Sequence, residues 1–236
     1  MRKFSKTKDK KAHQRALVPF PGATKQDFKA ALDAAKEEVP DVLVLVLFGD
    51  DMAKALKMVT AMGLKKKMSI VVPNLTLGMA KSAGPEAMEG VVGALPWAWN
   101  IPEQYNYETG KKFVETFSKR YDAYPSSSAA SAYSILYQYK DAVERAGSFE
   151  TAKVRKALEG HKYSLLKDEQ EWRAFDQQNI QTVYAVKGKT KEDILKDKYQ
   201  SDYFEILTSM SGEKAARTQR QWKNDRFKAN KSSILN

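Results

Sequence analysis

Two short apolar runs, each followed by a polar turn, constrain this chain more than any other feature. Val42–Phe48 stops at Gly49-Asp50-Asp51, and Met68–Val72 stops at Pro73-Asn74-Leu75-Thr76. The stretch between the two runs has the apolar spacing of a helix. Apolar runs of this kind are typical of strands that are buried on both faces of a parallel sheet. The sequence therefore predicts a β-α-β unit with both strands in the core.

The polar turns after these runs supply the first candidate binding residues. Neighbouring parallel strands end at the same edge of a sheet, and ligands bind in the crevice outside that edge. The candidates are Gly49, Asp50, Asp51, Asn74, Leu75 and Thr76. For Asp50 and Asp51, pairing with a ligand's amino group competes with simple helix capping, and for Asn74 the alternative is an ordinary Asx turn.

Composition excludes several classes of site. The length of 236 residues allows one large domain or two small ones, and 42% apolar residues can form a real core. The absence of cysteine removes disulfides, thiolate nucleophiles and Cys-ligated metals. The two histidines, His13 and His161, stand in no recognisable motif, and no phosphate-binding loop or zinc motif occurs. We therefore expect neither a cofactor nor a metal.

The formal net charge of +11 raises the question of a nucleic-acid partner. Nucleic-acid binding usually concentrates basic residues on one face. Here the lysines are scattered, as in 65–67, 111–112 and 223–231, and they alternate with Asp and Glu on the polar sides of amphipathic stretches. The pattern favours solvated lysines and no nucleic-acid partner.

No stretch reaches the roughly 20 apolar residues of a membrane span. The N-terminal residues 1–11 are basic but lack the apolar centre of a signal peptide. A product with this sequence as written is therefore expected to stay in the cytoplasm.

The first half of the chain reads as alternating strands and helices. Leu17–Phe20 has the pattern of a short strand. Thr24 begins a helix that ends at Val39-Pro40, and Asp27 stands three residues after it as in a capping box. Gly63 suits the end of the next helix, and Gly90–Pro96 reads as a further strand. This order predicts parallel strands with right-handed crossovers.

The second half is mainly helical. Aromatic residues recur at helical spacing after Thr109, a break at 125–127 caps a new helix, and a further helix begins at Ser148 and is closed by Gly160. Gln181–Val186 reads as a strand. Glu213–Phe227 predicts a basic, exposed helix.

Three aromatic residues are further ligand candidates. Trp97 and Trp99 follow the strand Gly90–Pro96 and could line an apolar ligand pocket, with packing between lobes as the alternative. Tyr133 lies on a helix face, where core packing is the competing interpretation.

Several segments, taken in order, resemble one protein family. They are Pro40-Asp41-Val42-Leu43, Ala61-Met62-Gly63-Leu64, residues 82–91, Tyr133 and Ala142-Val143-Glu144-Arg145-Ala146-Gly147. Their order resembles the extracytoplasmic solute-binding proteins of branched-chain amino-acid-type ABC importers, relatives of leucine/isoleucine/valine-binding protein. The resemblance covers the chain from about Leu17 to about Lys187.

The resemblance implies a fold and a division of the chain. The fold is an α/β fold of the type I periplasmic-binding class, in which a mostly parallel sheet is flanked by helices and two lobes enclose the ligand. By resemblance, residues 16–103 form the core of the second lobe and residues 104–167 are helices of an incomplete first lobe. Residues 168–207 cross and return to the second lobe, and residues 208–236 form a basic tail. The central sheet of the first lobe has no counterpart here, so we expect an N-terminally truncated chain.

The resemblance also implies a function. The chain would bind an amino acid or a related small organic acid by closure of the lobes and would then dock on an ABC permease, in the periplasm and without catalysis. A ligand-sensing module with the same fold is the main alternative. An α/β enzyme using Asp50 or Asp51 as a base lacks a second catalytic group, and a basic nucleic-acid binder is the remaining alternative.

One residue departs from the family's pattern. The turn that often carries a glutamate for the ammonium group of the ligand holds Asn74 here. An amide cannot neutralise an ammonium as a carboxylate does. The departure makes another organic acid, an amide or an aromatic compound a plausible ligand.

Overall fold

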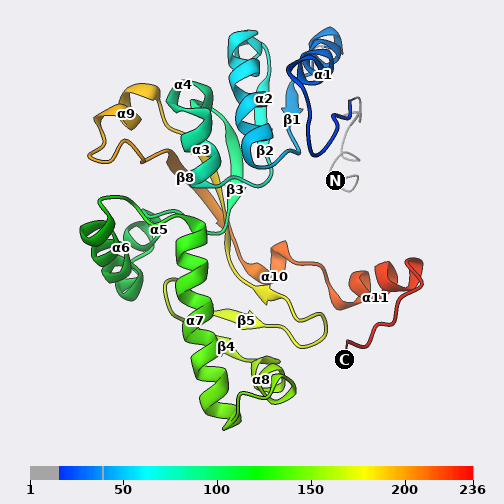
Figure 1. Ribbon diagram of the computed structural model, residues 1–236, viewed down its shortest axis with the longest axis vertical. Coiled ribbons are helices and arrows are strands. Elements are labelled where there is room, and N and C mark those ends of the chain that lie inside the picture. Colours follow the sequence, from blue (N-terminus) through cyan, green and yellow to red (C-terminus); the bar gives the residue numbers. More distant parts are fainter. Residues whose placement is uncertain (1–15, 39, 236) are drawn as a thin grey trace.

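The computed structural model describes residues 16–38 and 40–235 (Figure 1). These residues form two regions, one above the other in Figure 1. The sheet region contains a five-stranded sheet with helices α1–α4 and α9. The helical region contains α6, α7 and α8 with a three-stranded sheet.

The structure has the following helices and strands. The longer helices are α1 (Lys25–Glu38), α2 (Gly49–Ala61), α3 (Leu77–Ala83), α6 (Glu108–Tyr121), α7 (Ser127–Ala146), α8 (Thr151–Leu158), α9 (Lys191–Lys196) and α11 (Gln219–Lys228). The single-turn helices are α4 (Pro85–Met88), α5 (Ile101–Gln104) and α10 (Gly212–Ala215), with a 3-10 turn η1 at Leu64–Lys66. The strands are β1 (Val42–Val44), β2 (Ser69–Val72), β3 (Val92–Leu95), β4 (Lys162–Tyr163), β5 (Gln170–Trp172), β6 (Asn179–Ile180), β7 (Val183–Gly188) and β8 (Phe204–Met210).

The larger sheet has the strand order β1-β2-β3-β7-β8. The pairs β1–β2 and β2–β3 are parallel, as predicted from the β-α-β-α-β order. The pairs β3–β7 and β7–β8 are antiparallel, so the sheet is mixed. The predicted α/β class is confirmed.

The main hydrophobic core lies between this sheet and its helices. It includes fully buried residues of α2 and β2, such as Met52, Leu56 and Val72. Gly93 of β3 allows the turn after β2 to lie close, because a Cβ atom there would stand 2.4 Å from Leu75 Cδ1 and 2.5 Å from the Val72 carbonyl oxygen. The backbone N–H of Leu75 donates to the Ala94 carbonyl at 2.9 Å. The sheet therefore fixes this turn from behind.

The prediction for the first apolar run was wrong in two ways. The strand covers only Val42–Val44, and several side chains of the run are exposed rather than buried: Val42, Val44, Val46 and Phe48. The physical reason is position, because β1 pairs with one neighbour and stands at the end of the strand order among the described residues. Leu45 is the one buried residue of the run.

Helix ends test the capping predictions. Thr24 and Asp27 form the expected reciprocal cap, with the Thr24 N–H donating to Asp27 Oδ2 at 2.8 Å and the Asp27 N–H donating to Thr24 Oγ1 at 3.2 Å. Gly63 follows α2 in the left-handed conformation, at a φ of 65°. Asp50 and Asp51 were expected to cap α2, but its N-cap is Phe48 and both carboxylates lie in the first turn. Their charges still complement the positive end of the helix dipole.

Two other predicted elements differ. Leu17–Phe20 is not a strand but irregular chain that leads into a turn. The helix predicted to begin at Ser148 begins at Thr151, because the Ser148 Oγ instead accepts from the Glu150 N–H at 3.0 Å in a short local turn.

The C-terminal segment is two helices, α10 and α11, rather than one. Thr218 starts α11 with a capping box to Gln221. The segment was expected to be exposed, yet Trp222 is buried and its ring lies 5.7 Å from that of Phe175. A single aromatic anchor therefore holds an otherwise solvated basic helix.

The helical region has a smaller core. Its buried members are Trp97, Ala130 and Leu166, with partly buried side chains of α6 and α7 packed around them. Phe113, Phe117 and Tyr121 form the predicted aromatic ladder along α6, though Tyr121 is exposed. In the described part of the chain, no helix combines the length and apolar character needed to cross a bilayer.

Candidate functional site

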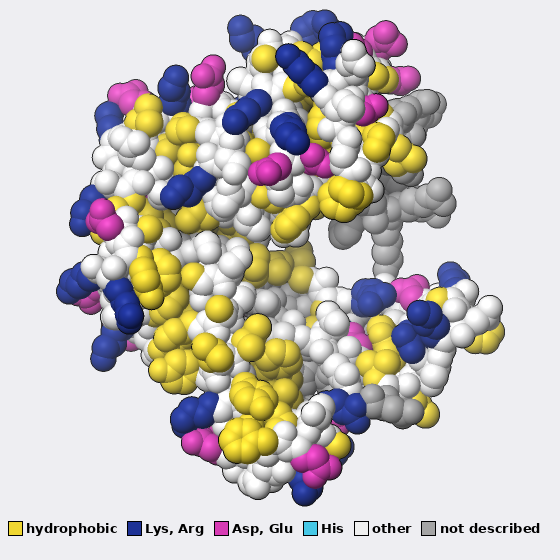
Figure 2. All heavy atoms as spheres, in the orientation of Figure 1, with side chains coloured by type: hydrophobic (Ala, Val, Ile, Leu, Met, Phe, Trp, Pro, Cys, Tyr) yellow, Lys and Arg dark blue, Asp and Glu magenta, His cyan; other side chains and the backbone are white. Residues whose placement is uncertain are grey.

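A hollow lies where the turn after β2 faces the start of α7. One wall consists of Asn74, Leu75 and Thr76, and the opposite wall includes Ser127, Ser128 and Ser131. These walls are about fifty residues apart in the sequence. We call this space the outer hollow. Figure 2 shows that a band of apolar side chains runs along the junction of the two regions.

Each wall is held by a capped helix. Thr76 is the N-cap of α3, and its Oγ1 accepts from the Met79 N–H at 3.2 Å. Ser126 is the N-cap of α7, and its Oγ accepts from the Ala129 N–H at 3.2 Å. The first turn of α7, with Ser127 and Ser128, therefore presents backbone N–H groups and hydroxyls at one side of the hollow.

The outer hollow is uncharged. It measures about 420 Å³, it is open to solvent, and its lining consists of amide, hydroxyl and apolar side chains. A site of this composition binds ligands by hydrogen bonds and by the dipole of α7, rather than by a salt bridge from its own lining.

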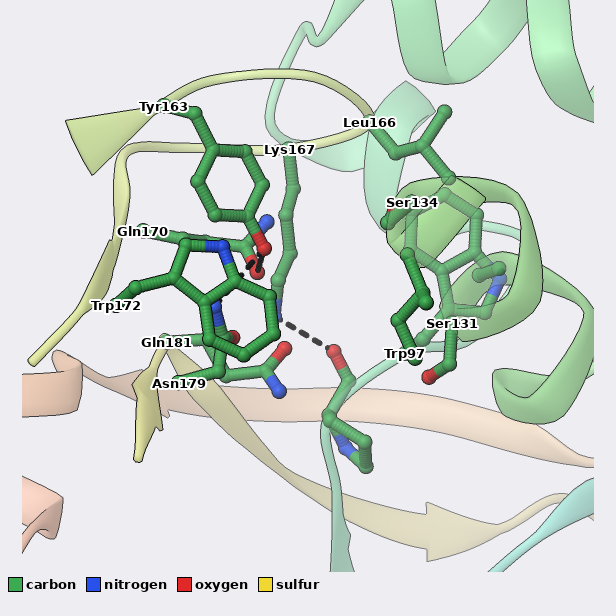
Figure 3. Close-up of a pocket in the computed structure, with 13 residues that line it drawn as sticks. Trp97, Ser131, Ser134, Tyr163, Leu166, Lys167, Gln170, Trp172, Asn179 and Gln181 are labelled. Carbon is green, nitrogen blue, oxygen red and sulfur yellow. Dashed lines mark hydrogen bonds between the residues drawn. The ribbon is translucent and has the colours of Figure 1, made fainter. Parts of the chain in front are cut away.

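A second compartment adjoins the outer hollow and shares Pro96, Ser131 and Ile135 with it. We call it the inner pocket. It measures about 130 Å³ and lies between the β4–β6 sheet on one side and α7 with Trp97 on the other (Figure 3). Its remaining lining comes mainly from Tyr163, Leu166, Lys167, Gln170, Trp172 and Asn179.

Lys167 is the distinctive group of the inner pocket. The side chain is almost fully buried, and its Nζ donates to the Pro96 carbonyl at 2.8 Å and to the Thr182 carbonyl at 2.7 Å. Burial lowers the pKa of Lys167 to about 8, against a smaller opposing effect of the charge on Asp168. The general prediction that lysines of this chain are solvated is wrong here, because the two carbonyl groups replace the water that this ammonium loses.

Four of the nine predicted site residues lie at these two spaces. Asn74, Leu75 and Thr76 line the outer hollow together, and Trp97 lines the inner pocket. The Trp97 Nε1 donates to the Pro125 carbonyl at 3.3 Å, which orients the indole beside α7. The role of these four residues in ligand binding stays a prediction.

The other five predicted residues do not line either space. The Gly49 N–H donates to Met79 Sδ at 3.2 Å, Asp51 lies 3.6 Å from Lys54 Nζ, and Asp50 is exposed on α2. Trp99 and Tyr133 are engaged in aromatic packing. Trp99 stacks on Tyr124 with ring centroids 4.0 Å apart and donates to Asp202 Oδ1 at 3.0 Å, and Tyr133 packs 4.8 Å from Phe113.

Sequence reasoning missed most of the inner pocket. Lys167 follows Leu165 and Leu166, and a single lysine directly after two leucines was a signal that could have been read. Gln170 and Trp172 stand in an ordinary polar stretch that carried no such signal. Among residues 16–38 and 40–235, no group of three or more His, Asp or Glu side chains is placed to hold a metal ion.

A family model described as periplasmic binding protein matches residues 8–193. No curated protein matches the chain significantly. Several solved structures do.

A periplasmic ligand-binding protein of a branched-chain amino acid ABC transporter from Burkholderia xenovorans is 25% identical, with a TM-score of 0.71 over 86% of this chain and 52% of that chain. An amino acid ABC transporter substrate-binding protein from Pseudomonas fluorescens is 27% identical, with a TM-score of 0.68 over 80% of this chain and 49% of that chain.

A more distant neighbour extends the range of bound molecules. It is a solute-binding protein of an ABC transporter from Rhodopseudomonas palustris, in complex with 3,4-dihydroxybenzoic acid. At 18% identity and a TM-score of 0.65, over 81% of this chain and 50% of that chain, it shares the fold. The chain spans about half the length of each of these three structures.

Proposed function

This chain belongs to the family of periplasmic binding proteins, and we propose that it binds an amino acid or a related small organic acid as the solute-binding component of an ABC importer. The predicted resemblance to the branched-chain amino-acid-type binding proteins is confirmed, and so is the type I fold. The family and these structural neighbours are solute-binding proteins rather than enzymes. We infer that this chain likewise performs no catalysis.

The observation that carries the proposal is the outer hollow. Segments from two regions of the chain meet there, and both present hydrogen-bonding groups to one uncharged space. A ligand that contacts both walls stabilises the arrangement in which the walls are close. Binding would therefore shift the molecule toward a closed form, which is the mechanism we propose.

The division of the chain follows from the same reasoning. We propose that residues 16–103 form the core of one lobe and residues 104–167 belong to the other. Residues 168–207 would cross and return, and residues 208–236 would form a tail. Two separate hydrophobic clusters support two lobes, one around the five-stranded sheet and one around Ala130 and Leu166, to which Trp97 is added from just before the boundary.

The chemistry of the hollow favours an organic acid over a zwitterionic α-amino acid. The start of α7 suits a carboxylate, because backbone N–H groups and the helix dipole both favour negative charge there. The opposite wall offers Asn74, whose amide oxygen can accept a hydrogen bond but cannot neutralise an ammonium. The aromatic acid held by one neighbour fits the same class of ligand.

We propose a periplasmic location and docking of the closed form on a membrane permease. Both follow from membership of the family and from the ABC transporter neighbours.

A thermal-shift screen with amino acids, amides and organic acids tests the proposal. A ligand that binds only the folded state raises the unfolding midpoint, and the gain in stability grows with the logarithm of ligand concentration over Kd. We expect at least one organic acid to raise it. A folded sample with no shift for any compound would count against ligand binding.

A charge placed at the start of α7 localises the effect. Ser128→Asp puts a carboxylate at the helix dipole, so it keeps or raises stability but repels an anionic ligand. Thr151→Asp is the matched control, because it adds the same charge to the first turn of α8. Ligand binding should be lost in Ser128→Asp and retained in Thr151→Asp. Equal binding in both would place the ligand elsewhere.

A further inference from the structure

The inner pocket adjoins the outer hollow of the proposed function, but most of its lining is its own. We propose that it binds a compact monocarboxylate with a ring-sized apolar body, with the Lys167 ammonium holding the carboxylate (Figure 3). The inference does not depend on the proposed transport role.

The volume of the inner pocket limits the size of the ligand. The pocket measures about 130 Å³. An apolar cavity of about 150 Å³ in another protein holds one benzene molecule. A single ring or an aliphatic body of similar size therefore fits, and a two-ring compound does not.

The aromatic walls of the pocket favour a ligand with a flat apolar part. Trp172 and Tyr163 stand on one side of the space, and Trp97 stands on the other (Figure 3). Leu166 closes the same side as Trp97. Flat aromatic surfaces on two sides favour a flat apolar body, since offset and edge contacts between rings add to the gain from burial.

The charge of the pocket lining favours a negatively charged ligand. Of the thirteen residues that line the pocket, Lys167 is the one charged side chain. The neighbouring Asp168 does not line it, and its Oδ2 instead accepts from the Thr182 hydroxyl. An anionic guest therefore meets one positive charge and no carboxylate of the lining.

The ammonium retains a donor for such a guest. An ammonium has three N–H donors, and Lys167 uses two of them on the carbonyl groups of Pro96 and Thr182. Because Lys167 is buried, an ionic hydrogen bond from it is stronger than one in bulk water. The lowered pKa of Lys167 agrees with a desolvated charge that a carboxylate would stabilise.

A second donor group stands beside the first. Asn179 Nδ2 donates to the Tyr163 hydroxyl at 2.9 Å, and that hydroxyl donates to Gln170 Oε1 at 3.0 Å. This chain of bonds orients the Gln170 amide with its oxygen occupied. Within the described part of the chain, the Gln170 Nε2 has no bonded acceptor. Lys167 and Gln170 both line the pocket, so each offers a donor to a carboxylate bound there.

Calorimetric titration with benzoate and with benzamide tests the inference. The two probes share one ring and differ in charge. We expect benzoate to bind about tenfold to a hundredfold more tightly, the range for a hydrogen bond to a charged group. Lys167→Met should abolish that preference, whereas Lys162→Met, which removes an exposed lysine of β4, should keep it.

A second variant keeps the test decisive if Lys167→Met does not fold. Ser134→Leu fills the pocket from α7 without touching the charge, so it should abolish benzoate binding. Equal affinity for the two probes, or no benzoate binding by the folded protein, overturns the inference. So does benzoate binding that survives Lys167→Met and Ser134→Leu but is lost in Ser128→Asp. That last result would place the carboxylate in the outer hollow and leave the proposed function intact.

Discussion

The sheet region and the helical region bury apolar surface to very different extents. Around the five-stranded sheet, residues such as Met52 and Leu56 are completely buried. In the helical region three residues are buried in the cluster, while Leu136 and Tyr137 of α7 stay exposed. Because stability follows buried apolar area, the sheet region has its own source of stability and the helical region relies more on its junction with the sheet region.

The largest expected effect comes from emptying the better-packed core. Leu56→Ala removes a side chain of α2 with no exposed surface, so it should lower the free energy of unfolding by about 2–5 kcal/mol. Urea unfolding followed by circular dichroism measures the change.

The matched variant lies in the helical region. Leu136→Ala removes the same atoms from a side chain that is 69% exposed, and it should change the free energy of unfolding by less than about 0.5 kcal/mol. If the two leucines prove equally costly to remove, α7 is covered in solution and the contrast between the regions is wrong.

An effect of intermediate size should come from Lys167, which sits where the regions meet. Its pKa is lowered from 10.5 to about 8 in the folded protein. Between about pH 8 and pH 10.5, Lys167 is therefore protonated in the unfolded chain and mainly neutral in the folded chain. Stability therefore rises with pH through this window. By pH 10 the gain should be about 2–3 kcal/mol, at ~1.36 kcal/mol per pKa unit.

Tyrosines near Lys167 limit the upper end of this pH range. Burial raises the pKa of Tyr184, whose ring lies 5.3 Å from the Lys167 Nζ, and that of Tyr107, while Asp168 adds a nearby negative charge. Unfolded tyrosine ionises near pH 10, so stability should fall above that pH. Unfolding measured from pH 7 to 10 should show the rise in the natural protein and a flatter profile in Lys167→Met. Parallel profiles would show that Lys167 is not desolvated.

An effect smaller than that of Lys167 measures one contact between the regions directly. Tyr124, which follows α6, stacks on Trp99 with an interplanar angle of 4°, and its hydroxyl donates to Asp197 Oδ1 at 2.7 Å in the sheet region. A double-mutant cycle of Trp99→Ala and Tyr124→Ala should give a coupling energy of about 0.5–1.5 kcal/mol. A coupling energy near zero would mean that this aromatic pair does not help to hold the regions together.

Local signals in the sequence predicted local structure well. The capping pair Thr24 and Asp27, the left-handed Gly63 and the turn Asn74–Thr76 all depend on neighbours within a few residues, and each is where the sequence indicated. The exposure of Val42 and Val44 depends instead on the place of β1 in the sheet, which no local pattern records.

The candidate site divides in the same way. Asn74 and Thr76 could be predicted because strand ends converge in any parallel sheet. Lys167 could not, because its partners Pro96 and Thr182 come from distant parts of the chain. Trp99 was predicted as a ligand contact because it is aromatic, but only the structure shows that the Tyr124 ring stacks on it.

The two carbonyl groups held by Lys167 restrict how the molecule can bend. Pro96 follows β3 and Thr182 precedes β7, so one ammonium ties the two connecting segments together at the start of the sheet region. A rotation whose axis passes near Nζ leaves both bonds intact. A sliding motion that separates the segments breaks these bonds and leaves the buried ammonium without acceptors, which costs far more free energy than such a rotation. These two hydrogen bonds therefore oppose shear between the segments more than they oppose rotation about Nζ.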